Sequence, residues 1–345
     1  MDPLILLLIG MAIVIGCILA FRMHAFLALS LAGITVAMIT PLQNLQDYAA
    51  YQVERKEAGN KGGWSEQQAE SFVADARSKP AVERFAKELG VMAGKIAILI
   101  AMAAIIGKCL LDSGAADRIV RTALRIVGEK RAPIAFIGSG FTLGIPVFFD
   151  TVFYLMIPLG KALRLRTGGN YTLYILTIVA GATMAHSLVP PTPGPLQVAA
   201  DLNINLGLMI AGGIVVGLCT ATAGYGWALF ANRRVEVPLR ESADTSIKDL
   251  EQLVKKPDSE LPPFWLAITP ILLPVLLITF ATIIGALGKE NVPAALKSTF
   301  DVLGNKNIAL IIATAIALVM LAWQNRASLN DLTTAVGTAL ASGGV

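Results

Sequence analysis

Two ionisable residues lie inside apolar stretches of this chain, where a charged group is costly unless it serves a function. His186 follows the apolar run "YTLYILTIVAGATM", and Asp150 is the only acidic residue between positions 133 and 160. An imidazole with an ordinary pKa of about 6.5 exchanges protons near neutral pH, and burial brings a carboxyl group toward the same range. Both residue types therefore indicate proton transfer. The alternatives are a neutral His186 bonded to a neighbouring helix and a salt bridge from Asp150 to a lysine such as Lys108.

The segment "AHSLVPPTPGP", residues 185–195, interrupts the same region with prolines at positions 190, 191, 193 and 195. Proline has no backbone N–H, so nearby carbonyl groups lose their helical partners. At membrane depth such carbonyls persist only where protein or a wet cavity covers them. There they can bind a cation, a proton-bearing water or a substrate hydroxyl, while the N-terminus of a half-helix suits a carboxylate. The alternative is a proline kink or a turn displaced from the core.

The composition places these residues in an all-α polytopic membrane protein. Of the 345 residues, 55% are hydrophobic and 15% are charged, whereas soluble domains carry about 25% charged residues. Several apolar runs reach the length of about 20 residues that a membrane-spanning helix needs. The net charge of +4 requires no nucleic acid as a partner. The three cysteines are far apart in the chain, so we expect no disulfide framework, no metal site and no cofactor.

The expected membrane segments of the first part of the chain, residues 1–230, follow from these apolar runs. They lie near 3–20, 24–42, 91–112, 133–160, 171–203 and 205–230. The polar stretch 43–90 is expected outside the bilayer, on the extracytoplasmic side, as one or two short amphipathic helices. A cytoplasmic linker covers 231–262, and two more spans are expected near 263–287 and 306–323.

The segment 133–160 is interpreted as a re-entrant hairpin rather than a simple span. Basic clusters flank it on both sides, in "DRIVRTALRIVGEKRAP" and "KALRLR", and such clusters mark the cytoplasmic face. Gly138, Gly140, Gly144 and Pro146 near its middle allow the chain to turn. With this hairpin, the basic loops agree on one topology, with the amino terminus outside.

The first part of the chain crosses the membrane five times, besides the hairpin. Because five is odd, a second copy of the same plan that begins near 263 starts from the opposite side and would be inverted. Inverted repeats with broken helices are typical of secondary transporters. Only two spans of the second copy precede the end of the sequence, so 263–345 is expected to be an incomplete second repeat of a longer protein. Gly and Ala are abundant in the spans, which favours close helix packing and is compatible with a homo-oligomer.

Three segments together resemble the gluconate:proton symporter family, the GntP type of the ion-transporter superfamily. They are "IGKCLLDSGAADRI", "GFTLGIPVFFDTVFYLMIPL" and "AHSLVPPTPGP", in this order. The resemblance implies an inner-membrane (cytoplasmic-membrane) carrier, not an enzyme, which imports a sugar-acid anion together with protons. Relatives often carry Glu at the position of Asp150 and a second His at the position of Thr192, and the 43–90 loop is longer than is usual in the family.

The leading hypothesis is therefore a proton-coupled symporter for gluconate or a related sugar acid in the lipid bilayer. One alternative is a carrier of another small organic acid, such as glycerate, lactate or a dicarboxylate, with sodium as an alternative coupling ion. A remote alternative is an intramembrane hydrolase that uses a serine, His186 and Asp150. The expected substrate- and proton-binding residues are Ser139, Gly140, Thr142, Gly144, Asp150, Thr151, His186, Ser187, Pro190, Pro191, Thr192, Pro193, Gly194 and Pro195.

Overall fold

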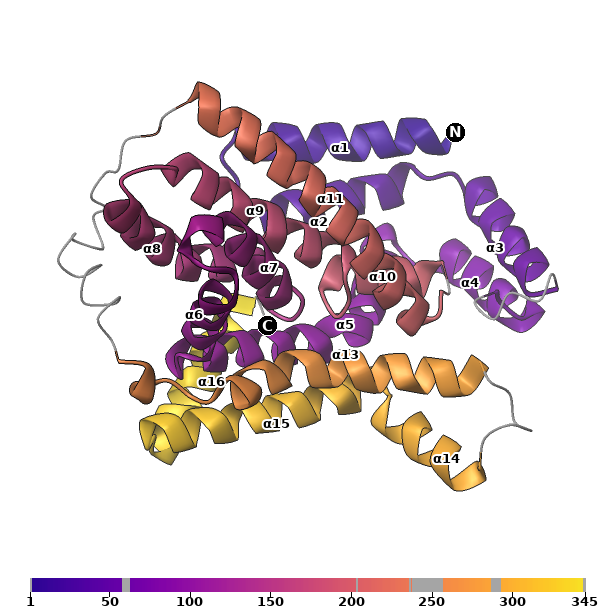
Figure 1. Ribbon diagram of the computed structural model, residues 1–345. Coiled ribbons are helices and arrows are strands. Elements are labelled where there is room, and N and C mark those ends of the chain that lie inside the picture. Colours follow the sequence, from indigo (N-terminus) through magenta and orange to yellow (C-terminus); the bar gives the residue numbers. More distant parts are fainter. Residues whose placement is uncertain are drawn as a thin grey trace. The chain divides into compact units, whose positions relative to one another are not determined.

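The computed structural model describes residues 2–57, 63–202, 204–235, 237, 257–286 and 293–343 (Figure 1). All regular structure in these ranges is helical, and they contain no β-strand. Parts of the predicted linker 231–262 and the end of the predicted span 263–287 lie outside the described residues. The chain divides into two compact units, Met1–Lys95 with Asp201–Asn203, and Ile96–Ala200 with Ile204–Val345.

Unit 1 consists of an apolar helix pair followed by two polar helices. Its elements are α1 (Pro3–Leu19), α2 (Ala25–Ile39), α3 (Leu42–Glu57), α4 (Glu66–Ser78) and the first half of α5 (Ala81–Asp112). Asp2 caps α1 by accepting a hydrogen bond from the Leu4 N–H, and Ser65 and Gln68 form a capping box at the start of α4. The aromatic rings of Tyr48, Trp64 and Phe72 pack together between α3 and α4.

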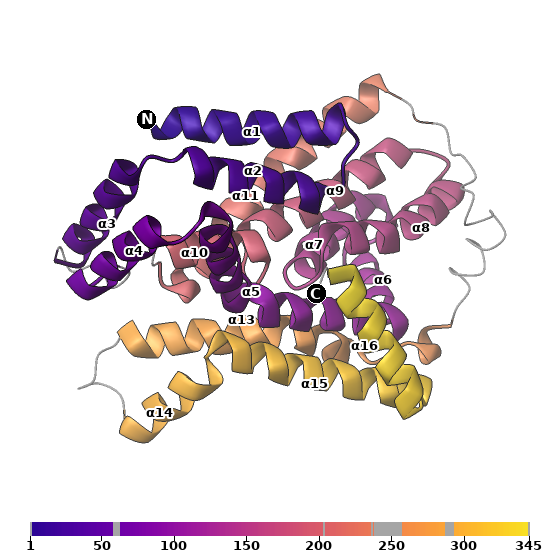
Figure 2. The same cartoon turned by 180° about the vertical axis from the view of Figure 1, so that it is seen from behind.

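Unit 2 contains the helices that carry the predicted site. They are the second half of α5, α6 (Ala115–Val127), η1 (Glu129–Arg131), α7 (Ala132–Gly144), α8 (Phe149–Thr167), α9 (Tyr171–Leu188), α10 (Pro193–Asp201), α11 (Leu206–Arg234), η2 (Asp258–Glu260), α13 (Phe264–Ala286), α14 (Ala294–Leu303), α15 (Lys306–Asn325) and α16 (Leu329–Gly343). Helices α13 and α15 run side by side, as Figures 1 and 2 both show.

Several helices are long and apolar enough to cross a membrane. Among the described residues, four qualify singly: Tyr171–Ala200, Leu206–Arg234, Phe264–Gly285 and Lys306–Asn325. Two further helix pairs, bent at a short break, raise the number to six, and α1 is a shorter apolar helix. This is the all-α, multi-span architecture that the composition predicts.

Polar contacts connect the ends of several helices of unit 2. The Arg166 guanidinium, near the end of α8, pairs with the Glu129 carboxylate just before α7 at 2.8 Å, so α7 and α8 form a hairpin whose two outer ends meet. Asn232 of α11 accepts a hydrogen bond from the Leu173 N–H at 3.1 Å and donates one to Asn170 at 2.9 Å. The start of α9 therefore lies beside the end of α11.

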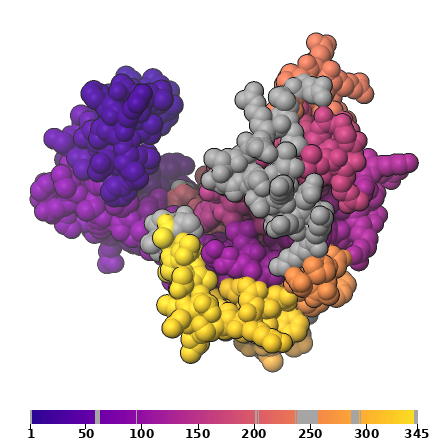
Figure 3. Space-filling view, turned by 90° about the vertical axis from the view of Figure 1, so that its left-hand side faces the viewer, coloured from indigo at the N-terminus to yellow at the C-terminus, as the bar shows by residue number. Residues whose placement is uncertain are grey.

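A second set of contacts surrounds the end of α5. Gly114, with a left-handed φ of 75°, lets α5 end and α6 begin at once. Asn325, the last residue of α15, donates to the Asp112 carbonyl oxygen at 2.9 Å, and Gln324 donates to the Glu260 carbonyl oxygen at 2.7 Å. Figure 3 shows the yellow C-terminal helices beside the orange segment that precedes α13. Three arginines of α6, at positions 118, 121 and 125, bind Asp258 in η2.

Candidate functional site

Helices α7 and α9 touch backbone to backbone through glycines. A Cβ atom added to Gly181 would lie 2.2 Å from the Ile137 carbonyl oxygen, and one added to Gly144 would lie 2.7 Å from the Ala182 carbonyl oxygen. Residue 137 faces 181, and residue 144 faces 182 and 185, so the two helices run in the same direction. Their C-terminal ends, and the chain breaks that follow, are therefore brought to one level.

The break after α7 faces the end of α9. It spans Ile145 to Phe148, and its first three residues are buried. The Phe148 ring lies 5.8 Å from the His186 imidazole, centroid to centroid. His186 also interacts with the backbone of Val147 and with the charge of Asp150. The start of α8, which carries Asp150 in its first turn, thus follows directly on the residue that contacts His186.

The break after α9 is internal rather than a solvent-exposed linker. Val189 is fully buried, Thr192 is 3% exposed, and both prolines between them are buried. A Cβ atom added to Gly213 of α11 would lie 2.2 Å from the Leu188 carbonyl oxygen, so α11 packs directly on the break. Gly213 is seven residues, or about 10 Å, past the start of α11. A turn displaced from the core does not fit this arrangement.

The prolines leave specific carbonyl groups without helical donors. In a continuous helix the carbonyls of His186, Ser187 and Val189 would accept from positions 190, 191 and 193, which are all prolines. The Thr192 hydroxyl donates to the Val189 carbonyl at 2.9 Å and replaces one of these bonds. The carbonyls of His186 and Ser187 lose their helical donors. They are the backbone acceptors that a substrate hydroxyl or a cation could use.

The N–H groups available to an anion belong to α8 more than to α10. Two of the first three positions of α10 are prolines, so only Gly194 has an N–H there, contrary to the expectation of several donors. In α8 the first bond from within the helix is that of the Val152 N–H. The N–H groups of Phe149, Asp150 and Thr151 precede it without a side-chain cap.

Asp150 is exposed in this chain, whereas the sequence predicts a buried carboxyl group. It lies in the first turn of α8, where the positive end of the helix dipole favours a carboxylate. No ion pair to Asp150 is found among the described residues, and Lys108, one predicted partner, pairs with Asp112 at 2.9 Å instead. The carboxyl group is therefore open to protons and to a ligand.

The remaining predicted residues differ in their burial and in their hydrogen bonds. Ser139 is 2% exposed, and neither its hydroxyl oxygen nor His186 Nδ1 finds a hydrogen-bond partner within the part of the chain that the structure describes. Thr142 donates to the Gly138 carbonyl of its own helix at 2.9 Å. Thr151 is half-buried and Ser187 is exposed. Gly140 and Gly144 face the backbone of α9, and the Thr192 hydroxyl already donates to the Val189 carbonyl. Binding roles for all the predicted residues stay predictions.

Sequence reasoning did not single out the residues that hold these helices together. Gly181 and Gly213 contact neighbouring backbones, and Phe148 contacts the imidazole. A signal was present: Gly140 and Gly144, like Gly213 and Gly217, have the small-xxx-small spacing that lets membrane helices approach closely. No group of three or more His, Cys, Asp or Glu residues that could hold a metal ion occurs among the described residues.

Comparison with known proteins gives the family. Residues 73–345 match the family model described as GntP family permease. A gluconate permease of Pseudomonas aeruginosa is 31% identical over 239 residues, which are 69% of this chain and 51% of that protein. A gluconate permease of Zymomonas mobilis is 32% identical over 252 residues, 72% of this chain and 54% of that protein.

A third relative aligns along almost the whole chain. The Gnt-II system L-idonate transporter of Escherichia coli is 25% identical over 341 residues, 98% of this chain and 67% of that protein. The chain spans about half the length of the first two relatives, and no solved structure matches it. The family model covers more than half of the chain and confirms the resemblance that the three segments predicted. The chain is therefore a multi-pass membrane protein that belongs to the GntP family of permeases, not an enzyme.

Proposed function

We propose that this protein is part of a proton-coupled symporter that imports gluconate or a related sugar-acid anion across the cytoplasmic membrane. The observation that supports the proposal is the contact between the break after α7 and the end of α9, where the Phe148 ring lies 5.8 Å from the His186 imidazole and Asp150 follows two residues later. The relatives named as gluconate permeases supply the substrate class. The relative named as an L-idonate transporter supports the wider class of sugar acids.

The position of Asp150 suggests how proton and anion bind together. When ionised, its carboxylate occupies the positive end of α8 and repels a second carboxylate. When protonated, it leaves the N–H groups of the first turn to the substrate, as helix N-termini generally bind anions. Protonation of Asp150 therefore favours substrate binding, and a bound anion favours protonation, because such a coupling acts equally in both directions.

The rest of the site would hold the hydroxyl-bearing end of the sugar acid. The free carbonyls of His186 and Ser187 accept hydrogen bonds from hydroxyl groups, and His186 Nδ1 offers one more polar atom. The proposed cycle has four steps: protonation from outside, binding of the anion, movement of the loaded part, and release of both inside. His186 is the second candidate proton carrier in this cycle.

The proposal is tested by uptake of labelled gluconate into proteoliposomes that contain the protein made from its complete gene. We expect accumulation when the outside is acidic, and loss of accumulation when an ionophore dissipates the proton gradient. Accumulation that ignores the proton gradient would contradict the coupling. If gluconate is not taken up at all, labelled idonate, glycerate, lactate and dicarboxylates are tested in its place. Replacement of sodium by choline in the same assay tests sodium coupling.

We also propose that residues 1–230 form the first repeat, 231–262 a cytoplasmic linker, and 263–345 the beginning of an inverted second repeat. The contacts between the ends of α7, α8, α9 and α11 support a common side for the basic segments. A single cysteine at Ser65 should react with an impermeant maleimide in intact cells, and one at Arg125 should react only after lysis. The opposite pattern would overturn the topology.

A further inference from the structure

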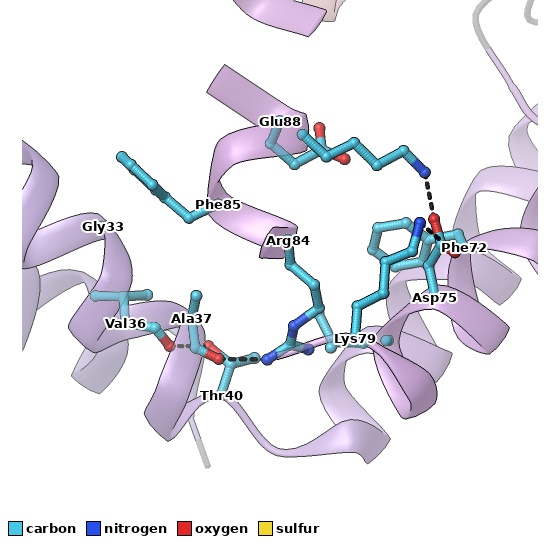
Figure 4. Close-up of a pocket in the computed structure, with 13 residues that line it drawn as sticks. Gly33, Val36, Ala37, Thr40, Phe72, Asp75, Lys79, Arg84, Phe85 and Glu88 are labelled. Carbon is cyan, nitrogen blue, oxygen red and sulfur yellow. Dashed lines mark hydrogen bonds and ion pairs between the residues drawn. The ribbon is translucent and has the colours of Figure 1, made fainter. Parts of the chain in front are cut away.

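Unit 1 contains a cavity of about 260 Å³ between α2, α4 and the first turns of α5 (Figure 4). Most of its wall is apolar. The apolar lining residues include Val36, Ala37, Leu45, Phe72, Ala76 and Phe85. This volume equals that of about nine water molecules at about 30 Å³ each, which is more than a bare inorganic anion fills. None of its lining residues belongs to the site described above, and the family match includes only the lining residues from Asp75 onward.

Two of the three cations that line the cavity share one acid. The Asp75 carboxylate pairs with Lys79 at 2.9 Å and with Lys87 at 2.5 Å, and Figure 4 shows Lys79 directed toward it. Hydrogen bonds from Lys87 and Lys79 hold the pKa of Asp75 below its ordinary value of 3.8, so the carboxylate stays ionised near neutral pH. These two lysines are therefore already engaged by protein.

Arg84 is the third cation, and it forms no ion pair with any described residue. Its Nη2 donates to the Ala37 carbonyl oxygen at 2.6 Å, at the C-terminal end of α2 (Figure 4). Its Nε is buried and has no hydrogen-bond partner within the described residues. The helix end stabilises the guanidinium through the dipole but does not neutralise it. Glu88, the other acid that lines the cavity, is exposed and acts on Lys87.

A guanidinium that lines an apolar cavity, and that forms no ion pair with the described residues, has a defined chemical complement. Arginine binds carboxylate and phosphate through charge-assisted hydrogen bonds. The lining carries three cations against two acids, which favours an anion. We propose that this cavity binds an aliphatic chain with a carboxylate or phosphate head, with the head on Arg84 and the chain against Phe72 and Phe85.

Trp64 provides a reporter for this proposal, because its ring lies 5.0 Å from that of Phe72. The other three tryptophans, at positions 227, 265 and 323, are 65%, 78% and 64% exposed and can be replaced by phenylalanine. In detergent, ω-bromoundecanoate and ω-bromoundecyl phosphate should quench Trp64 fluorescence at concentrations about tenfold lower than ω-bromoundecanol does. Equal quenching by the acids and the alcohol would overturn the proposal.

Two variants and one matched control test the role of the residues. Arg84→Gln should weaken binding of both anionic probes about tenfold and leave the alcohol unchanged, whereas Arg77→Gln, the same charge change outside this cavity, should have no effect. If Arg84→Gln loses helicity, Ala76→Phe replaces it as the test. This variant fills the cavity and keeps the arginine, so it should weaken binding of the anionic probes. Unchanged affinity in Ala76→Phe, or equal effects of the two arginine variants, would overturn the proposal.

The source of the ligand is settled in lipid nanodiscs with the same reporter. Nanodiscs of phosphatidylglycerol should suppress quenching by the anionic probes, relative to phosphatidylcholine, if a bilayer lipid occupies the cavity. Equal quenching in both lipids supports a free amphiphilic anion instead. Absence of any specific quenching in both lipids, with helicity intact, would contradict a site for either source.

Discussion

Replacement of Gly213 by alanine should damage the protein, whereas the same change at its neighbour Gly212 should not. A Cβ atom at position 213 would lie 2.2 Å from the Leu188 carbonyl oxygen, while nothing lies within 4 Å of a Cβ atom at position 212. The two residues are adjacent in α11, so composition, helix and depth are matched. What differs is only the closeness of the chain break that follows α9.

The magnitude follows from this contact. To restore an ordinary separation of 3.4 Å, the Leu188 carbonyl and the new methyl group must move apart by more than 1 Å. Overpacking of this kind costs about 1–3 kcal/mol, and a backbone atom cannot rotate away as a side chain does. Alanine gains about 1 kcal/mol of helix propensity over glycine. We therefore expect Gly213→Ala to lower the free energy of unfolding by up to about 2 kcal/mol, and Gly212→Ala not to lower it.

The assay is thermal unfolding in detergent, combined with uptake by the protein from its complete gene. A loss of this size lowers the unfolding midpoint by on the order of 5 °C. Gly213→Ala should also reduce uptake, because the shifted carbonyl belongs to the same break as His186. Equal midpoints and equal uptake in the two variants would refute the claim that α11 fixes the break.

Three further predictions concern polar groups. Asp150→Asn removes the titratable charge, so gluconate exchange should continue while accumulation driven by a proton gradient is lost; unchanged accumulation would point to His186. Asn232→Ala removes the bonds to Leu173 and Asn170 and should lower the free energy of unfolding by about 1–3 kcal/mol, measured by thermal unfolding beside wild type. Burial alone would raise the pKa of Asp258, but the hydrogen bond from Arg121 and the charges of Arg125 and Arg118 outweigh it and hold that pKa below 3.8. The stability from this carboxylate is therefore full above pH 3.8 and is lost as the pH falls through the lowered value, so the advantage of wild type over Asp258→Asn should shrink in acid.

The sequence alone predicted the features that depend on local chemistry. The prolines at 190–195 predict a broken helix because they remove N–H donors, and the structure ends α9 at Leu188. Basic residues at both ends of one apolar stretch predict a hairpin, and the structure has a helix pair from Ala132 to Thr167, whose re-entry into the membrane stays a prediction. These signals are short in range, and they need no knowledge of neighbouring helices.

What depends on contacts between helices could not be predicted in the same way. An apolar segment such as α9 is hydrophobic on most of its faces, so periodicity does not say which face meets α7. Asp150 was expected to be buried because its neighbours in sequence are apolar, yet the turn before α8 directs it outward. The polar stretch 43–90 predicts short amphipathic helices, and its charges alone give no sign of a cavity lined by Arg84.

The glycine contact between α7 and α9 limits how the proposed transport cycle can proceed. Sliding of packed helices normally relies on side chains that change rotamer at the interface. Here the carbonyl of Ile137 faces Gly181 directly, with no side chain between them to absorb a shift. We therefore expect α7 and α9 to move together as one rigid body. In the proposed transport cycle, the motion that alternates access would then pivot at the short unwound segments, so the residues proposed to bind the substrate would also form the hinges.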